Sequence, residues 1–367
     1  MTRIAITGSG LFTPETSISN DELVASYNAY VERHNAANPQ AEPLQSSSSE
    51  FIVKASGIHS RHVVDKEGIL DVERMRPRIR ARRDDEPSLM CEMALAAAGQ
   101  ALAAAGRTAA DVDAVLVAAS NMPRAYPALA VELQQHLGCG GFAYDMNVAC
   151  ASATFGVQAA VDALRNGSAR AVLVVSPEIC SGHLNFRNRD CHFIFGDACT
   201  ALLLERMEGA GIGGLFEVLG TRLKTKYSNN IRNNFGFLNP AEEPARPWDD
   251  LLFRQEGRKV FKEVVPMVSE LILSHLADLG ISVTNLRRLW LHQANLSMNQ
   301  LIGKRVLGHE PSAAESPTIL DEYANTSSAG SVIAFHKHHA DLKTGDLGVL
   351  CAFGAGYSAG SVVLRRC

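Results

Sequence analysis

Short apolar runs alternate with longer amphipathic stretches along most of the chain. Six runs of β-branched and aliphatic residues have the length of buried strands: 3–8, 113–120, 171–176, 200–205, 286–292 and 347–354. Alanine-rich stretches with helical spacing of apolar residues lie between them, at 88–106, 128–138, 152–167 and 261–280. Because strand and helix alternate, the pattern predicts an α/β fold with a mostly parallel sheet and helices on its faces.

The order of elements in the first part of the chain recurs in the second. A helix end and a strand span 276–295, a further helix follows, and then comes the segment LKTGDLGVLCAFGAG at 342–356. This echo predicts a structural duplication, with an N-terminal half at 1–205 and a C-terminal half at 206–367.

Two segments fall outside the alternation. Residues 28–50 are polar with a serine run, and we expect an irregular insertion or mobile loop there. A second insertion near 65–87 contains six arginines between residues 73 and 87. These arginines form either a positively charged binding surface for an acidic or phosphorylated partner, or a solvated segment whose charge Asp84, Asp85 and Glu86 partly neutralise.

Composition narrows the class of protein. The chain has 367 residues, is 46% hydrophobic and 20% charged, and carries a net charge of −4, which gives no general case for nucleic-acid binding. No apolar run is long enough to span a bilayer, and the first residues lack the pattern of a signal peptide. Eight cysteines without CxxC pairs signal neither a zinc site nor a disulfide framework. A cytoplasmic protein with reduced thiols and no membrane contact is the expectation.

Cys150, in NVACASATFG, is the first candidate for chemistry. Most free cysteines are core thiols, and that alternative applies here too. Its place at an expected strand-to-helix junction, among small residues, would however put the thiol near a helix N-terminus, which favours the thiolate.

Three later motifs carry further candidates. His292 ends an apolar strand, at the sheet edge where α/β proteins bind ligands, although a structural hydrogen bonder there is as common. Asn325 precedes a run of small residues and is either a helix cap or a site residue. The glycines of AFGAG at 352–356 let backbone N–H groups face a pocket, as an oxyanion site requires. The histidines at 336, 338 and 339 lack a carboxylate at metal spacing, so we expect them at the surface.

Taken together, these motifs resemble the β-ketoacyl-acyl carrier protein synthase III group of the thiolase superfamily. The resemblance covers nearly the whole chain outside the two insertions. It rests on GIHSRHVV, NVACASATFG, FGDACTALLLE, GRKVFKEVV, LHQANLSM, YANTSSAGS and AFGAGYSAGS. It implies a thiolase-like fold of two duplicated βαβαβαββ-type halves, packed as an α-β-α-β-α sandwich, and a homodimer.

The resemblance also assigns roles. Cys150 would take an acyl group from acyl-CoA, while His292 and Asn325 would hold the thioester carbonyl of malonyl-acyl carrier protein (ACP) as CO2 leaves. Backbone N–H groups of Cys150 and Ala355 would form the oxyanion site, beside Phe353. The product would be β-ketoacyl-ACP in fatty acid biosynthesis, made by this acyltransferase without cofactor or metal.

Binding residues follow from the same resemblance. Substrate contacts are expected at Phe51, Tyr126, Gly257, Phe261 and Ala294, with Tyr126 reaching across the dimer to limit acyl length. The acidic carrier protein would meet a basic patch of Lys262, Lys304 and Arg305.

Several positions depart from the family pattern. Phe51 replaces a tryptophan and Ala55 an arginine that typically hold the adenine end of CoA, so the grip on the nucleotide must differ. Ser297 replaces an arginine of the carrier-protein contact, and Ala355 replaces a glycine, which is tolerable if its φ is negative. These changes and the 28–50 insertion suggest a divergent branch that prefers a longer, medium-chain acyl primer to acetyl-CoA.

Rival functions are distinguishable by sequence. Thiolases place a second catalytic cysteine where this chain has Phe353, while Cys351 lies within the apolar strand and is expected in the core. Chalcone-synthase-like enzymes usually show GFGPG, and no candidate matches the catalytic glutamate of hydroxymethylglutaryl-CoA synthases. Two alternatives stay open: a secondary-metabolite synthase of the same family with another acceptor, and a catalytically silent partner subunit.

Overall fold

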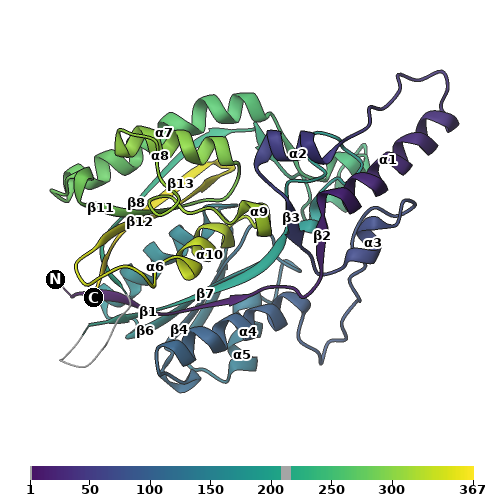
Figure 1. Cartoon of the computed structure of the whole chain (residues 1–367). Helices are drawn as coiled ribbons and strands as arrows, with labels where there is room; N and C mark the ends of the chain where they lie inside the picture. Colours follow the sequence, from purple (N-terminus) through teal and green to yellow (C-terminus); the bar gives the residue numbers. More distant parts are fainter. Residues whose placement is uncertain (1, 208–215) are drawn as a thin grey trace.

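The chain folds into five layers, in which three layers of helices enclose two layers of strands (Figure 1). The computed structural model describes residues 2–207 and 216–367. The strands of the main sheet are β1 (Ile4–Phe12), β4 (Ala114–Ala118), β5 (Phe142–Met146), β6 (Ala171–Ile179), β7 (Asp197–Arg206), β8 (Phe216–Ser228), β11 (Leu286–Leu291), β12 (Leu347–Gly354) and β13 (Gly356–Arg366). The helices are α1 (Asn20–Ala37), α2 (Ser49–Ser56), α3 (Lys66–Leu70), α4 (Leu89–Ala104), α5 (Leu129–Leu137), α6 (Ser152–Asn166), α7 (Gly257–Asp278), α8 (Leu296–Leu307), α9 (Leu320–Tyr323) and α10 (Ala329–Lys337).

Helices α6 and α10 form the central layer. Both helices contact strands of the two strand layers. Helices α4 and α5 cover the outer face of the layer that contains β1 and β4 to β7, and α7 and α8 cover the outer face of the layer that contains β8 and β11 to β13. Both central helices bury residues on several faces: Ser152, Ala153 and Thr154 of α6 are buried in succession, and so are all residues of α10 from Ala329 to Phe335. This α-β-α-β-α arrangement agrees with the layering that the resemblance implies.

The main sheet is mixed rather than mostly parallel. Its order is β11-β12-β13-β8-β1-β7-β6-β4-β5. Within the described residues three neighbouring pairs are parallel, β4–β5, β4–β6 and β11–β12, and five are antiparallel. The prediction of a mostly parallel sheet is therefore wrong, because an apolar run reveals that a strand is buried and not which way it points.

Strands from the two parts of the chain occupy opposite ends of this sheet. Those between residues 4 and 206 end at β5, those from 216 onward end at β11, and β1 and β8 join them through two residue pairs. The duplication itself, with its boundary at 205/206, stays a prediction.

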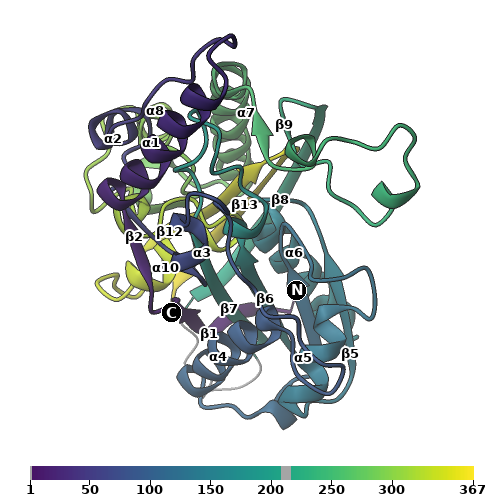
Figure 2. The ribbon, with the colours of Figure 1, turned by 90° about the vertical axis from the view of Figure 1, so that its right-hand side faces the viewer.

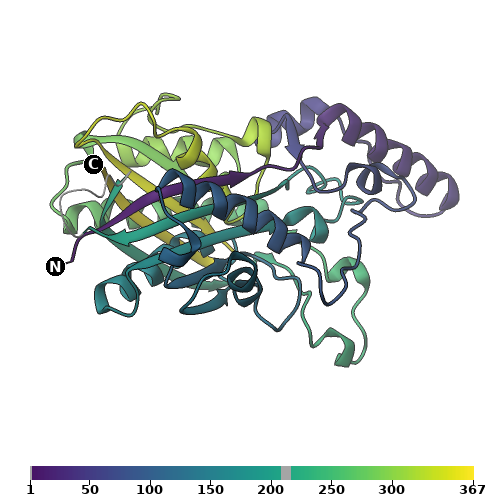
Figure 3. The same cartoon turned by 90° about the horizontal axis from the view of Figure 1, so that it is seen from below.

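The segment 28–50 is not an irregular insertion over its whole length. Residues 28–37 continue α1, which begins with a capping box between Ser19 and Glu22, and α2 begins at Ser49. Leu23, Tyr27 and Val31 of α1, spaced by four, are buried. Figures 1 and 3 show α1 extending from the sheet body on the side away from both termini. Only residues 38–48 form a loop.

The two-stranded pairs lie outside the main sheet. They are β2 (Ser17–Ser19) with β3 (Ser60–His62), and β9 (Ile231–Arg232) with β10 (Arg254–Gln255). Between β9 and β10 the chain forms an arm that projects from the body (Figure 2).

Carboxylates neutralise part of the arginine-rich segment, as one of the two alternatives expects. Ion pairs join Arg78 to Asp71, Arg80 to Glu86, Arg82 to Glu92 and Arg83 to Asp85. Arg74 and Arg76 have no such partner among the described residues.

The surface position expected for His336, His338 and His339 is wrong. All three are half-buried. The Nδ1 atom of His336 lies 2.9 Å from Ser9 Oγ, and the ring of His339 stacks on Phe335 at a centroid distance of 5.2 Å. Helix α10 is packed in the core, so the histidines at its end follow it inward. Within the two described ranges, no helix has the length and apolar character needed to cross a membrane.

Candidate active site

The three candidate catalytic residues line one cavity of about 560 Å³. Cys150 precedes α6, His292 follows β11, and Asn325 lies between α9 and α10. Elements from both ends of the sheet therefore meet at this cavity. Its remaining lining includes Phe51, Phe195, Phe253, Phe261, Ala294 and Phe353.

Cys150 is half-buried and faces the cavity, so the alternative of a core thiol is wrong. Ala149, just before it, has a φ of 49°, a left-handed conformation that a residue other than glycine adopts at a cost of about 1 kcal/mol. This turn places Cys150 one residue before Ala151, the N-cap of α6, and the partial positive charge of this helix end favours an anionic sulfur.

Burial raises the pKa of the Cys150 thiol to about 11. A hydrogen bond from Ser327 Oγ, at 3.4 Å, lowers that pKa, and the negative charge of Glu178 raises it further. Hydrogen bonds from the backbone N–H groups of Cys150 and Ala355 also lower it. Both N–H groups thus lie near the sulfur, where an oxyanion formed on a Cys-bound carbonyl would find them.

The glycine loop after β12 approaches the nucleophile closely. A Cβ atom on Gly354 would lie 2.6 Å from Cys150 Cβ and 3.0 Å from its sulfur, so only glycine leaves the sulfur its room. Ala355 is not among the residues with positive φ, so an alanine is tolerable here in place of the glycine that the family pattern has. Phe353 is buried and packs edge-on against His292, at a centroid distance of 5.2 Å. Cys351 is buried in β12, as expected.

His292 is buried, and burial lowers the pKa of its imidazole to about 4. The ring is therefore neutral at pH 7. Its Nδ1 atom has no hydrogen-bond partner among the described residues. Gln293 fixes the following turn, because its side chain donates to the Leu291 carbonyl and accepts from the Ile319 N–H.

Asn325 is buried and does not cap α10, whose N-cap is Ser328, so the capping alternative is wrong. Its backbone N–H donates to the Ile194 carbonyl at 2.9 Å, and its carbonyl accepts from Gly196 at 3.1 Å. The side-chain oxygen accepts from the Ser327 N–H at 2.8 Å. Because the oxygen is held in this way, the amide NH2 group is the part left to serve as a donor.

Sequence reasoning missed Glu178. It is fully buried in β6 and accepts hydrogen bonds from the backbone N–H and the hydroxyl of both Ser120 and Ser328. Burial raises its pKa to about 7. It ties the loop after β4 to the loop that carries Asn325, and its charge reaches Cys150. The sequence feature that could have revealed Glu178 is its position, since it is a carboxylate within an apolar strand.

The expected substrate-binding residues fall into two groups. Phe51, Gly257, Phe261 and Ala294 all line the cavity. Tyr126 does not; it is 84% exposed on the surface.

An arginine from another part of the chain lies beside Phe51, although position 55 itself is an alanine. The guanidinium of Arg189 lies over the Phe51 ring, 4.1 Å from its centroid. This cation–π pair at the mouth was not predicted, because Arg189 is 134 or more positions away from Phe51 and Ala55 along the chain.

The three basic residues expected to meet the carrier protein are all exposed. Lys262 lies on α7, next to Phe261 of the cavity, and Lys304 and Arg305 lie near the end of α8. Lys304 forms an ion pair with Glu310 at 2.5 Å.

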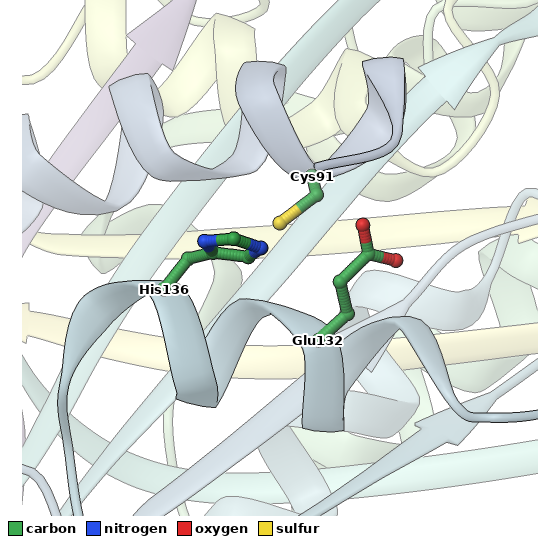
Figure 4. Close-up of side chains that lie close together, drawn as sticks. All are labelled: Cys91, Glu132 and His136. Carbon is green, nitrogen blue, oxygen red and sulfur yellow. The ribbon is translucent and has the colours of Figure 1, made fainter. Parts of the chain in front are cut away.

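Cys91, Glu132 and His136 lie close together on α4 and α5, with ligand atoms within 4.8 Å of one another (Figure 4). Two features oppose metal binding. Burial raises the pKa of Cys91 to about 12, whereas a metal ligand must be a thiolate. Glu132 already accepts hydrogen bonds from Ser88 and Arg124. All eight cysteines lie in the described ranges and are free thiols.

Comparisons with known proteins agree with this geometry. The family model described as 3-oxoacyl-[acyl-carrier-protein (ACP)] synthase III matches residues 144–222, and that of its C-terminal part matches residues 276–366. Beta-ketodecanoyl-[acyl-carrier-protein] synthase of Pseudomonas aeruginosa is 60% identical over 93% of this chain and 99% of its own. Beta-ketoacyl-[acyl-carrier-protein] synthase III of Mesorhizobium japonicum is 32% identical over 94% of this chain and 98% of its own.

Among solved structures, 3-oxoacyl-(acyl carrier protein) synthase III from Pseudomonas aeruginosa PAO1 superposes with a TM-score of 0.77. It shares 25% of its sequence and covers 99% of this chain and 98% of its own. The thiolase-like fold class is therefore confirmed. With relatives that match from near one end to the other, this chain belongs to the 3-oxoacyl-[acyl-carrier-protein] synthase III family of condensing acyltransferases.

Proposed function

We propose that the chain joins an acyl group bound to Cys150 with malonyl-ACP to give β-ketoacyl-ACP in fatty acid biosynthesis. The observation that carries the proposal is the meeting of Cys150, His292 and Asn325 on one cavity, with two backbone N–H groups at the sulfur.

In the first half-reaction the Cys150 sulfur attacks the acyl-CoA carbonyl. The sulfur–carbon bond forms as the thiol loses its proton, and the carbonyl oxygen becomes an oxyanion held by the N–H groups of Cys150 and Ala355. The bond to the CoA sulfur then breaks, and the proton that the thiol lost ends, through solvent, on the departing CoA thiolate. Because burial raises the thiol pKa to about 11, the helix N-terminus and these N–H groups act mainly on the transition state, in which negative charge develops.

In the second half-reaction malonyl-ACP loses CO2. The electron pair of the broken C–C bond forms an enolate, whose oxygen accepts hydrogen bonds from His292 and Asn325. Neutral imidazole suits this role, since it donates a hydrogen bond without giving up its proton to the enolate. The enolate carbon then attacks the acyl-Cys150 carbonyl, and the sulfur leaves.

A medium-chain acyl group is the proposed primer. The Pseudomonas relative is named for a β-ketodecanoyl product, which corresponds to an eight-carbon primer extended by two carbons of malonate. The cavity offers apolar walls for such a chain at Phe195, Phe253, Val260 and Val264.

The proposed partners are acyl-CoA and an acidic carrier protein. Lys262, Lys304 and Arg305 are exposed on neighbouring helices and supply positive charge on this side of the cavity. A cytoplasmic location and the absence of a metal or cofactor stay predictions.

A homodimer is also proposed. Strand β5 is an edge of the sheet and leaves a row of backbone groups unpaired, with Phe142 and Tyr144 exposed beside it. Tyr126 is exposed too, as expected of a residue that reaches a partner. Sedimentation equilibrium of the wild type should give twice the monomer mass, and the Tyr144→Asp variant should give a mass closer to that of the monomer. A wild-type protein with the mass of the monomer would contradict the proposal.

The test is transfer of the acyl group to the protein. Intact-mass spectrometry after mixing with acetyl-, octanoyl- and palmitoyl-CoA would show an octanoyl adduct formed fastest, and none with Cys150→Ala. A faster acetyl adduct would contradict the medium-chain primer. No adduct at all would favour the silent partner subunit, which the presence of Cys150, His292 and Asn325 together disfavours.

A further inference from the structure

A buried hydroxyl group, that of Ser327, contacts the sulfur of Cys150. It donates a hydrogen bond to this sulfur, with Oγ and Sγ 3.4 Å apart. Ser327 is only 2% exposed and is not one of the residues that line the catalytic cavity, whereas Cys150 is. The sulfur is thus in contact with the cavity and with a buried donor at the same time, and a thioester can approach it without displacing that donor.

The side chain and the backbone of Ser327 serve different catalytic groups. Its N–H donates to the side-chain oxygen of Asn325 at 2.8 Å. Burial lowers the pKa of His292, and the backbone of Ser327 raises that pKa by a smaller amount. Among the residues that the structure describes, the Ser327 hydroxyl donates to no acceptor other than the Cys150 sulfur. The backbone therefore acts on Asn325 and His292, and the hydroxyl on Cys150 alone.

The backbone conformation of Ser327 makes its side chain informative. Its φ is 50°, a left-handed conformation that glycine adopts freely and serine only against steric resistance. Strained positions of this kind cluster at functional sites, where the surrounding structure holds them in place. A glycine would relieve the strain and leave the Cys150 sulfur without its donor. The hydroxyl is thus what serine contributes at this position.

Negative charge develops on the Cys150 sulfur twice in the condensation. It develops first as the thiol loses its proton and attacks the acyl-CoA carbonyl, and again as the bond between sulfur and the acyl carbon breaks. A hydrogen bond to a charged acceptor is stronger than one to a neutral acceptor, so the bond from Ser327 strengthens at both moments. Ser327 keeps its own proton in both steps, and no further reactant is needed.

We propose that Ser327 is a further catalytic residue, whose hydroxyl stabilises the negative charge on the Cys150 sulfur in both half-reactions. This inference rests on the proposed function. It assigns the steps at the sulfur to the hydroxyl of Ser327 and leaves the steps at the enolate to His292 and Asn325. Its effect on the sulfur is opposite to that of the negative charge of Glu178.

Two variants remove this hydroxyl and keep the backbone. Ser327→Ala retains the Cβ atom, and Ser327→Gly also relieves the left-handed strain, so the second variant serves if the first folds poorly. The control is Ser331→Ala in α10. The hydroxyl of Ser331 is also fully buried, and it has no hydrogen-bond partner among the described residues. All three variants lose one buried hydroxyl, and only the first two lose the donor to the sulfur.

The first measurement separates the sulfur from the enolate. Acylation of Cys150 by octanoyl-CoA should be slower by ~10-fold or more in both Ser327 variants and unchanged in the control. Release of CO2 from malonyl-ACP without an acyl donor should stay at the wild-type rate in all of them, because the backbone that serves Asn325 and His292 is kept. Equal losses of acylation and CO2 release would mean that Ser327 only holds the loop. Acylation at the wild-type rate in both Ser327 variants would equally overturn the proposal.

The second measurement does not depend on the acyl donor. Alkylation of Cys150 by iodoacetamide is followed by peptide mass spectrometry from pH 7 to 10. Loss of the donor disfavours the thiolate, so the profiles of both Ser327 variants should shift to higher pH, and that of Ser331→Ala should match the wild type. Unchanged profiles would contradict the assignment. If the profiles shift but octanoyl-CoA acylates none of the proteins, the proposed function fails and the contact between Ser327 and the sulfur stands.

Discussion

Replacing Glu178 by glutamine removes a buried charge and keeps its shape. Both backbone N–H groups that Glu178 binds, those of Ser120 and Ser328, point at the same oxygen, Oε1. The amide oxygen of the introduced glutamine can accept them in the same way, and its NH2 group can donate to the Ser120 hydroxyl. The hydrogen bonds therefore survive the substitution, and the charge is what changes.

The size of the effect follows from the pKa. Burial raises the pKa of Glu178 from its ordinary value of 4.5 to about 7, which corresponds to roughly 3 kcal/mol. The folded state holds the proton more tightly than the unfolded state does. The stability that protonation provides is thus complete below pH 4.5 and is lost as the pH rises toward 7. Between pH 5 and 8 the loss is on the order of 2.5 kcal/mol.

Urea unfolding at pH 5 and pH 8, at one protein concentration, measures this loss. The wild type should lose about 2.5 kcal/mol more than Glu178→Gln over that range. The exposed Glu270→Gln serves as control and should keep the wild-type dependence. Equal pH dependence in wild type and Glu178→Gln would refute the argument that this carboxylate is held against its charge.

The same substitution should affect the nucleophile. The negative charge of Glu178 raises the pKa of Cys150, so Glu178→Gln should lower that pKa. Alkylation of Cys150 by iodoacetamide at pH 8, followed by intact mass, should then be faster than in the wild type. A slower reaction would mean that Glu178 acts mainly by positioning the loops.

Three further predictions concern the catalytic cavity. Gly354→Ala should reduce acylation of Cys150 by at least ~100-fold, because its methyl group would crowd the sulfur; a rate near that of the wild type would show that the loop can shift. His292→Ala and Asn325→Ala should each abolish most CO2 release from malonyl-ACP, about 100-fold or more, and leave acyl transfer from octanoyl-CoA intact; loss of acyl transfer alone would reverse the assigned roles. Burial lowers the pKa of His292 to about 4, so its imidazole stays neutral between pH 6 and 8. The rate of decarboxylation should therefore show no titration of His292 in that range, and the NMR resonances of its imidazole C–H groups should not shift.

The sequence was sufficient for much of the fold and for the reacting groups. Apolar runs and alanine-rich stretches located six strands of the main sheet and α4, α5, α6 and α7, because burial of one face imposes a period on the residues. Cys150 could be located because small neighbours and a following helix mark a strand-to-helix junction.

The direction of each strand, and the contacts between residues far apart in the sequence, could not be predicted from local patterns. The antiparallel pairs of β1 and β13 depend on how the chain returns, which no local period encodes. The sequence predicts a loop over most of α1, because the apolar stripe of this helix, Leu23, Tyr27 and Val31, is narrow within a polar sequence. Arg189 and Glu178 reach the site through packing alone, and only a folded structure brings them there.

The central claim is that Cys150, His292 and Asn325 carry out one condensation between them. Mass spectrometry of the carrier protein after incubation with octanoyl-CoA and malonyl-ACP measures this directly. The account predicts 3-oxodecanoyl-ACP with one CO2 released per product, absent in Cys150→Ala and strongly reduced in His292→Ala. An octanoyl-Cys150 adduct that forms normally but never yields a β-ketoacyl product with malonyl-ACP would contradict it.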